Sequence, residues 1–411
     1  MIDKTVLDNG LTIYTYVDKR KHTNAFEFVT KVGGFDKDFI YKNQEYHFQD
    51  GIAHILEHYL VEENDCGNFL NKLGNMQMNT NASTGTRMTD FYFSCVENLT
   101  EGINTILNGI YNVTFTEEKL KHLKNPIYQE IRSRSDSKFY QLDIEKSNNL
   151  FHNYTYLSVG GSLEEVHDTT IDDLKIYYEA FYKPSNQFIV VAGNFDKNEI
   201  INCVKEFYKD YTFEKDEISF INIDEDNSVA KDKSIISFPT GKDRVCISYK
   251  IKIPDLSPTE LLDYDFYLSC FLDDFFGVTS KLYRELVDNS IINSYIACGK
   301  KYVYDYLILE FSAFTDKEDE FIDKIKYQIN HLEEFNKELF ELSKKSCILE
   351  LIMRDENIYR MIMPFIDNIV RFNYVHVDEV NDIKKLKFED YVDTIKNIDF
   401  SNNCVTILLD K

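Results

Sequence analysis

The chain has 411 residues, of which 43% are hydrophobic and 14% aromatic, enough to fill the apolar cores of two or three domains. Its 46 Lys and Arg residues stand against 70 Asp and Glu residues, which gives a formal net charge of −24. Because nucleic-acid phosphates bind to basic surfaces, this balance argues against a nucleic-acid partner. The same charge fits either a solubilising surface or an acidic cleft for basic peptides.

The sequence gives no sign of a targeting or membrane-spanning segment. Its first residues, MIDKTVLDNGLTIYTYVDKRK, contain no apolar run of signal-peptide length, and about 18 consecutive apolar residues occur nowhere. We therefore expect a cytoplasmic protein without a membrane span. The eight cysteines are scattered without a C-x-x-C pair, which favours free buried thiols over disulfides or a thiolate metal site.

Strand-like and helical segments are mixed along the first half of the chain. Strands are expected at LTIYTYV (11–17), AFEFVTKV (25–32), DFYFSCV (90–96) and QFIVVAGNF (187–195). Helices are expected from Gly51 onward and over 99–110, 116–135 and 171–181. This order predicts an α+β fold.

The second half of the chain repeats the pattern of the first. DRVCISYKIKIPD resembles NAFEFVTKVGGFD, and the terminal NNCVTILLD resembles NQFIVVAGNFD, with about 160 residues between the two segments in each half. Between the halves lies KDEISFINIDEDNSVAKDKS, a charged segment that we interpret as a linker. The sequence thus predicts a first domain over 1–214, a linker over 215–234 and a related second domain over 235–411.

The segment GIAHILEHYLVEE carries three titratable groups among apolar neighbours. His54, Glu57 and His58 are spaced i, i+3 and i+4, so a helix places them on one face. A catalytic zinc ion usually takes three protein ligands and leaves one coordination position open. His54 and His58 are the first two expected ligands. Glu57 could take a proton from the attacking water and deliver it to a leaving amine.

The helix TEEKLKHLKNPIYQEIRSR offers a third ligand. Leu120, Leu123, Ile127 and Ile131 define its apolar stripe, and Glu130 falls on the flank of that stripe. A carboxylate beside a core face is costly unless it is paired or binds a metal. Glu130 is therefore the expected third ligand, and a salt-bridged surface carboxylate is the alternative reading.

His54-Ile-Leu-Glu57-His58, followed by Glu130, resembles the inverted zinc motif of the M16 (pitrilysin-like, inverzincin) metallopeptidases. Further similar segments are LDNGLTIY, IYQEI, FYKPSNQFIVVAGNFD and FFGVTSKLYRELVDNSIINSYI. The resemblance implies two homologous α/β-sandwich domains of the M16 type and a partner half that closes a chamber. It also implies Zn²⁺ bound by His54, His58 and Glu130, with Glu57 as the general base.

The segment NASTGTRMTDFYF resembles the edge strand on which that family lays its substrate. The resemblance implies that Asn81, Ala82, Ser83 and Thr84 bind the peptide by β-augmentation. Read without the family, the Asn/Thr/Gly-rich stretch could equally be a plain loop that leads into a strand.

Two positions depart from the family's pattern. Many members carry a second carboxylate seven residues before the third ligand, where this chain has Leu123. Active members also carry an Arg and, seven residues later, a Tyr in the second half. Here Val287 and Ser294 stand at those positions, with Tyr295 one place out of register.

These features lead to a functional expectation with alternatives. We expect a zinc-dependent endopeptidase acting on unfolded peptides or on leader and propeptide segments; a non-catalytic or weakly active scaffold subunit is the alternative. Because Val287 cannot donate a hydrogen bond, we expect a heterodimer in which a homologous subunit supplies the Arg and Tyr. A homodimer in which Tyr295 or Arg284 substitutes is the other possibility.

Overall fold

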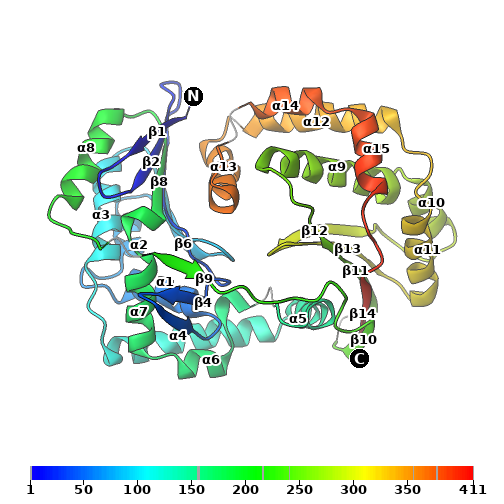
Figure 1. Cartoon of the computed structure of the whole chain (residues 1–411), viewed down its shortest axis with the longest axis horizontal. Coiled ribbons are helices and arrows are strands. Elements are labelled where there is room, and N and C mark those ends of the chain that lie inside the picture. Colours follow the sequence, from blue (N-terminus) through cyan, green and yellow to red (C-terminus); the bar gives the residue numbers. More distant parts are fainter. Residues whose placement is uncertain are drawn as a thin grey trace. The chain divides into compact units, whose positions relative to one another are not determined.

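The computed structural model describes residues 2–154, 158–214, 217–239, 241–354, 356–375 and 378–410. The chain forms two compact units. The first unit comprises residues 1–133, 157–222 and 354–377, and the second comprises 134–156, 223–353 and 378–411. Both mix helices with a sheet, so the predicted α+β class is confirmed (Figure 1).

A six-stranded sheet forms the centre of the first unit, with strand order β1-β2-β8-β3-β7-β6. Its strands are β1 (Asp3–Val6), β2 (Thr12–Val17), β3 (Asn24–Thr30), β6 (Asn79–Thr84), β7 (Thr89–Cys95) and β8 (Gln187–Gly193). β2 runs parallel to β8, whereas β3 is antiparallel to both β8 and β7. A small sheet of order β5-β4-β9 joins β4 (Asp38–Tyr41), β5 (Gln44–His47) and β9 (Ile218–Phe220).

Helices from the first half of the chain cover one face of the six-stranded sheet. The helical elements are α1 (Ile52–Glu62), α2 (Phe69–Asn75), α3 (Leu99–Tyr111), α4 (Glu117–Ser135), η1 (Ser158–Gly160), α6 (Leu163–Asp168), α7 (Ile171–Phe181), η2 (Pro184–Asn186) and α8 (Lys197–Tyr208). α7 begins with a capping box between Thr170 and Asp173. Phe26 and Phe28 of β3 lie in the core that these helices close.

The opposite face of this sheet is covered by α13 (Ile358–Phe372), which comes from the far end of the chain. Asn357 caps α13 by accepting a hydrogen bond from the Arg360 N–H. Its apolar stripe packs on Ala25 and Val29 of β3. Every residue of β3 is therefore buried.

The sheet of the second unit has five strands in the order β10-β14-β11-β13-β12. Its strands are β10 (Lys233–Ser237), β11 (Arg244–Lys252), β12 (Ala297–Val303), β13 (Tyr306–Phe314) and β14 (Asn403–Leu409). Its helices are α5 (Lys138–Leu150), α9 (Pro258–Phe276), α10 (Lys281–Asp288), α11 (Glu318–Asn330), α12 (Lys337–Arg354), α14 (Glu379–Lys385) and α15 (Phe388–Lys396).

The two sheets share one pairing pattern. β10 is parallel to β14, and β11 is antiparallel to both β14 and β13, as β2, β8, β3 and β7 are in the first unit. β3 and β11 are the two strands whose sequences resemble each other, and so are β8 and β14. The predicted repeat is thereby confirmed.

The compact units differ from a linear division of the chain by an exchange of two segments. α5 lies in the first half of the sequence, yet its Leu142 packs against Cys246 and Leu408 of the second sheet. Conversely, α13 lies in the second half of the sequence but belongs to the first unit. The segment expected as a linker over 215–234 contains β9, which pairs with β4 of the first unit; its residues 215 and 216 lie outside the described residues.

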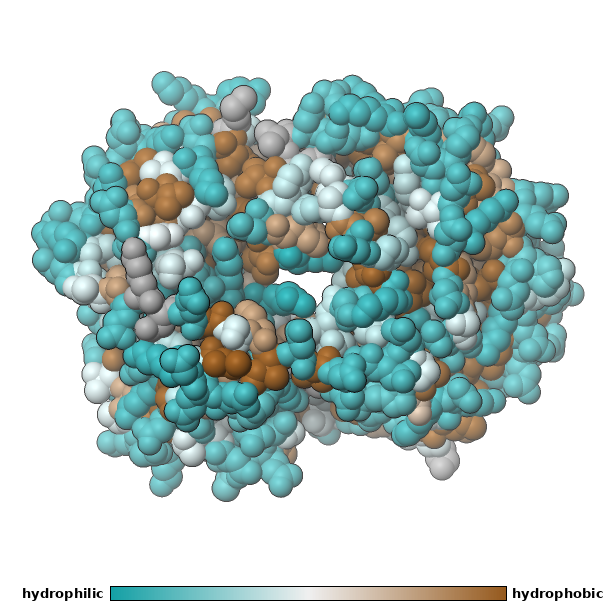
Figure 2. Space-filling model, viewed as in Figure 1, coloured by the Kyte–Doolittle hydropathy of each residue, from teal (hydrophilic) through white to brown (hydrophobic). Residues whose placement is uncertain are grey.

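Hydrophilic residues cover most of the face seen in Figure 2, in keeping with the high charge. None of the helices in the described part of the chain combines the length and apolar composition that crossing a bilayer requires. All eight cysteines are free thiols, and four of them are buried, namely Cys95, Cys246, Cys270 and Cys404.

Candidate metal centre

The centre is built on α1, whose first turn needs a glycine. Gly51 precedes the helix with φ of 84°, and a Cβ there would lie 2.9 Å from the backbone of Gly160 and Gly161. The loop at η1 can therefore approach the start of α1. Apolar residues then bury α1 in the core and leave a narrow polar strip with His54, Glu57 and His58.

Three atoms that could bind a metal ion converge between α1 and α4. The Nε2 atoms of His54 and His58 lie 3.2 Å apart, and Glu130 Oε2 lies 3.7 Å from the first and 3.6 Å from the second. Zinc bonds of about 2.0 to 2.1 Å in a tetrahedral site would separate two ligand atoms by about 3.3 Å. The three residues therefore fit a zinc ion.

Glu130 reaches this point from the flank of a buried helix stripe, as the sequence predicts. Leu120, Leu123, Ile127 and Ile131 of α4 are buried, whereas the Glu130 side chain is 39% exposed. The side chains of His54 and His58 are 11% and 22% exposed. The site is thus open to solvent mainly on the Glu130 side.

Glu57 lies on α1 beside these ligands but in a more enclosed environment. It is 7% exposed, and the hydroxyl of Thr84 donates a 2.8 Å hydrogen bond to its Oε2. Burial raises the pKa of Glu57 to about 7, although the nearby His58 and the Thr84 hydrogen bond act in the opposite direction. A carboxyl with such a pKa suits a general base that works near neutrality.

His58 has a second partner that sequence reasoning missed. Its Nδ1 lies 3.3 Å from Oε1 of Glu62, one helical turn later. Burial disfavours the imidazolium, but the hydrogen bond to Glu62 and the charges of Glu57, Glu62 and Glu130 outweigh it, so the pKa of His58 is raised. The i, i+4 spacing of His58 and Glu62 was the available signal.

Residues 79–84 form a strand, not the plain loop that was the alternative. β6 stands at the edge of the sheet, and no strand in the described residues pairs with its outer side. Asn81 and Ser83 are exposed, and Ala82 and Thr84 are half-buried. The Ser83 hydroxyl donates to the Asp90 carboxylate, so it is held toward the sheet. Substrate binding by these four residues stays a prediction.

The predicted contributors from the second half lie at and after the end of α10 in the second unit. Val287 is 39% exposed and Tyr295 is 63% exposed. An exposed tyrosine is available to a neighbouring molecule, and its role in substrate binding stays a prediction.

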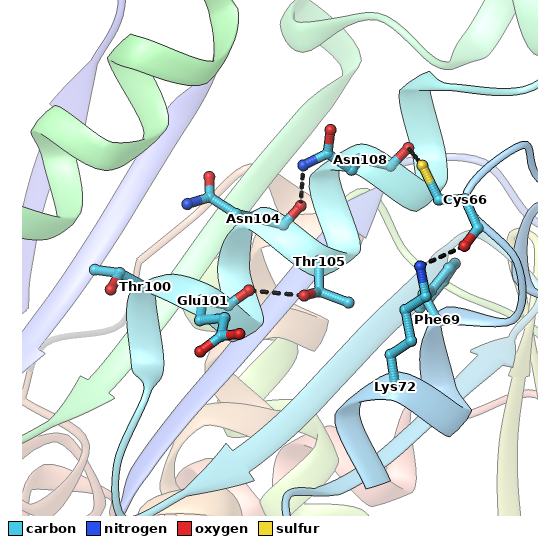
Figure 3. A pocket seen from close by; sticks show the side chains of 8 residues that line it. All are labelled: Cys66, Phe69, Lys72, Thr100, Glu101, Asn104, Thr105 and Asn108. Carbon is cyan, nitrogen blue, oxygen red and sulfur yellow. Dashed lines mark hydrogen bonds between the residues drawn. The ribbon is translucent and has the colours of Figure 1, made fainter. Parts of the chain in front are cut away.

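A separate pocket of about 450 Å³ lies beside α2 and α3 and shares no residue with the metal centre (Figure 3). Several of its polar groups are satisfied within the wall. The Asn108 amide donates to the Asn104 carbonyl, and the Thr105 hydroxyl donates to the Glu101 carbonyl. Lys72 Nζ donates to the Cys66 carbonyl.

Comparison with known proteins relates this geometry to a family. A family model described as the Peptidase M16 inactive domain matches residues 168–347. YmfH, an uncharacterized zinc protease of Bacillus subtilis (strain 168), is 27% identical over 348 residues, which covers 83% of this chain and 81% of that protein. In sequence the chain is thus similar to M16 peptidases and zinc proteases.

The M16 fold extends over the whole chain. The crystal structure of an M16-like peptidase from Alicyclobacillus acidocaldarius matches with a TM-score of 0.91 at 21% identity, over 100% of this chain and 98% of that one. A probable mitochondrial-processing peptidase subunit beta of Arabidopsis thaliana is 22% identical over 214 residues, which covers 50% of this chain and 38% of that protein. By its name, that M16 relative is one subunit of a peptidase.

The matched residues 168–347 do not include His54, Glu57, His58 or Glu130. The word inactive in the description of the family model therefore concerns another part of this chain than the candidate metal centre.

Proposed function

We propose that this chain is a zinc-dependent endopeptidase of the M16 family that hydrolyses unfolded peptides or leader and propeptide segments. One observation carries the proposal. His54 Nε2, His58 Nε2 and Glu130 Oε2 converge at 3.2 to 3.7 Å, and the buried carboxyl of Glu57 stands on the same helix. Two imidazoles and one carboxylate are the donor set of catalytic zinc sites that keep one position open.

A zinc ion bound by these three residues would act as a Lewis acid toward a water molecule and the peptide carbonyl. The Glu57 carboxylate accepts one proton of the attacking water, whose oxygen forms a bond to the carbonyl carbon. The C–N bond then breaks, and Glu57 delivers the proton to the leaving amine nitrogen. One water is consumed for each peptide bond cut, and Glu57 returns to its starting state.

The edge of β6 is the proposed place for the substrate backbone. The main-chain groups of Asn81, Ala82, Ser83 and Thr84 would pair with an extended peptide, and Thr84 joins that strand to Glu57. A peptide must be free to extend in order to add to a sheet edge and to enter a chamber closed by a partner half. Disordered peptides should therefore be cut, and folded domains of the same sequence spared.

The proposed assembly is a heterodimer with a homologous M16 subunit. The second half of this chain has Val287 where an Arg would assist the opposing site, and Val287 has no hydrogen-bond donor in its side chain. A homologous subunit that carries the Arg and Tyr would supply them. A homodimer that uses Tyr295 is the second assembly considered, and a cytoplasmic location is proposed for either.

Two measurements on the purified chain test the activity. Zinc content should approach one ion per chain after purification without chelator, and Glu57→Gln should keep that zinc while hydrolysis of a disordered peptide falls by about 10²- to 10⁴-fold. The matched control is Glu63→Gln, which removes a carboxylate at the C-cap of the same helix. It should leave hydrolysis unchanged. Full activity of Glu57→Gln would show that the assigned base is wrong.

A non-catalytic scaffold subunit is the second candidate function. Val287 favours this function, because its side chain cannot donate a hydrogen bond to a substrate carbonyl. An assembly in which neither half supplies such a donor would hydrolyse peptides slowly. Zinc binding without hydrolysis, both alone and with a homologous subunit, would support the scaffold over the peptidase.

A further inference from the structure

We infer that Glu62 is a positioning residue of the metal centre: its carboxylate fixes the His58 ring so that Nε2 faces the metal. This inference rests on the proposed function, because it concerns how a zinc ligand is held. It assigns a role to a side chain outside the group of His54, Glu57, His58 and Glu130.

The geometry around the His58 ring carries the inference. Nδ1 lies 3.3 Å from Glu62 Oε1, while Nε2 lies 3.2 Å from His54 Nε2 and 3.6 Å from Glu130 Oε2. An ionised carboxylate can only accept hydrogen bonds, so a neutral imidazole keeps its proton on Nδ1 beside Glu62. The lone pair of Nε2 then points toward the other two ligand atoms, which is the state that binds a metal.

The position of Glu62 makes this contact a feature of the helix. Glu62 is the last residue of α1 and stands at i+4 from His58. The same helical spacing that places His54 beside His58 therefore places Glu62 beside the His58 imidazole ring. The facing helix supplies no carboxylate at Leu123, which is 1% exposed within the apolar stripe of α4. The orienting acid is therefore provided by α1.

The contact is partly open to water, which sets the size of the expected effect. The side chains of His58 and Glu62 are 22% and 35% exposed. A bond of 3.3 Å between such groups competes with solvent, so a loss of zinc affinity of about 10- to 100-fold is expected on its removal, not a complete loss.

Zinc affinity measured by competition with a chromophoric chelator tests the inference without relying on activity. Glu62→Ala should weaken zinc binding by about 10- to 100-fold. Glu62→Gln should retain part of the zinc affinity, because its amide oxygen still accepts a hydrogen bond from the His58 Nδ1–H. Glu63→Ala is the matched control, since it removes the same charge one residue later and should change affinity by less than about twofold.

A second readout follows the ring itself. In metal-free protein labelled with ¹⁵N-histidine, the His58 resonances should report the tautomer with the proton on Nδ1, and Glu62→Ala should shift them toward the other tautomer. His58→Ala identifies the signal. A purely structural role for Glu62 would leave the tautomer unchanged in the folded variant.

The outcomes distinguish a failure of the Glu62 role from a failure of the proposed zinc-dependent function. Equal zinc affinity of the wild type and Glu62→Ala, or equal losses in Glu62→Ala and Glu63→Ala, would overturn the role of Glu62 alone. Absence of zinc binding by the folded wild type would instead overturn the proposed function, and this inference with it.

Discussion

The hydroxyl of Thr84 donates a 2.8 Å hydrogen bond to the Glu57 carboxylate and so joins the end of the edge strand to the buried acid of α1. This bond favours the ionised carboxylate and holds the pKa of Glu57 below the value that burial alone would give. A general base must be ionised to accept a proton. The strand that would bind the substrate therefore also lowers the pKa of the proposed general base.

Thr84→Val removes the hydroxyl and keeps the shape. We expect the acidic limb of the kcat/KM profile to move to higher pH, with a loss of about tenfold at pH 6 and a smaller loss at pH 9. Thr80→Val is the control, because the Thr80 hydroxyl donates to the Tyr92 carbonyl on the same strand pair and not to Glu57. A pH profile of Thr84→Val parallel to that of the wild type would contradict the role of this bond.

Zinc should stabilise the folded chain through Glu130. A ligand that binds only the folded state at about 1,000 times its Kd adds about 4 kcal/mol, so saturating zinc should raise the melting temperature of the wild type. Glu130→Gln replaces an anionic ligand by a weakly binding amide and should lose most of this rise. Glu118→Gln, an exposed change on the same helix, should behave as the wild type. Equal zinc-induced shifts in all three proteins would remove Glu130 from the ligand set.

A buried acid pair in the first unit should make stability depend on pH. Glu27 of β3 is fully buried and Asp90 of β7 is 1% exposed, and desolvation together with the charge of Asp90 raises the pKa of Glu27 well above its usual value. The folded chain then retains a proton that the unfolded chain has lost. Stability should fall as the pH rises from about 5 into the alkaline range, by up to about 1.4 kcal/mol per pH unit for one proton.

Glu27→Gln removes that titration, because the amide is neutral at every pH and can donate to Asp90. Its free energy of unfolding, measured in urea between pH 5 and pH 9, should decline less steeply than that of the wild type. At pH 8 the variant should be the more stable protein. Glu199→Gln, an exposed change on α8, should follow the wild-type slope. Identical slopes for Glu27→Gln and the wild type would mean that Glu27 is ionised in the folded chain.

The predicted heterodimer is tested by measuring the turnover of the chain alone and after addition of a homologous M16 subunit. Because removal of a preorganised oxyanion donor costs on the order of 100-fold or more in rate, addition of a subunit with the Arg and Tyr should raise turnover by that order. Tyr295→Phe should then have little effect. High turnover of the isolated chain, lost on Tyr295→Phe but not on Tyr327→Phe, would instead support the homodimer; Tyr327 is similarly exposed at 62%.

The sequence by itself determined those features that depend on local spacing. His54, Glu57 and His58 share a helix face because 3.6 residues make one turn, and the same rule places Glu130 on the flank of the α4 stripe. The expected helix over 171–181 coincides with α7, whose capping box is also a local signal. The repeat was visible because β3 and β11 carry similar alternating patterns.

Only the tertiary structure decided which segments cover which face. Strand alternation would leave Glu27 facing solvent, but α13 arrives from more than 300 residues away and buries it. The exchange of α5 and α13 between the units has no local signature, because it depends on which apolar surfaces meet. The Thr84 bond to Glu57 is of the same kind: a strand and a helix must pack before a hydroxyl can reach a carboxylate.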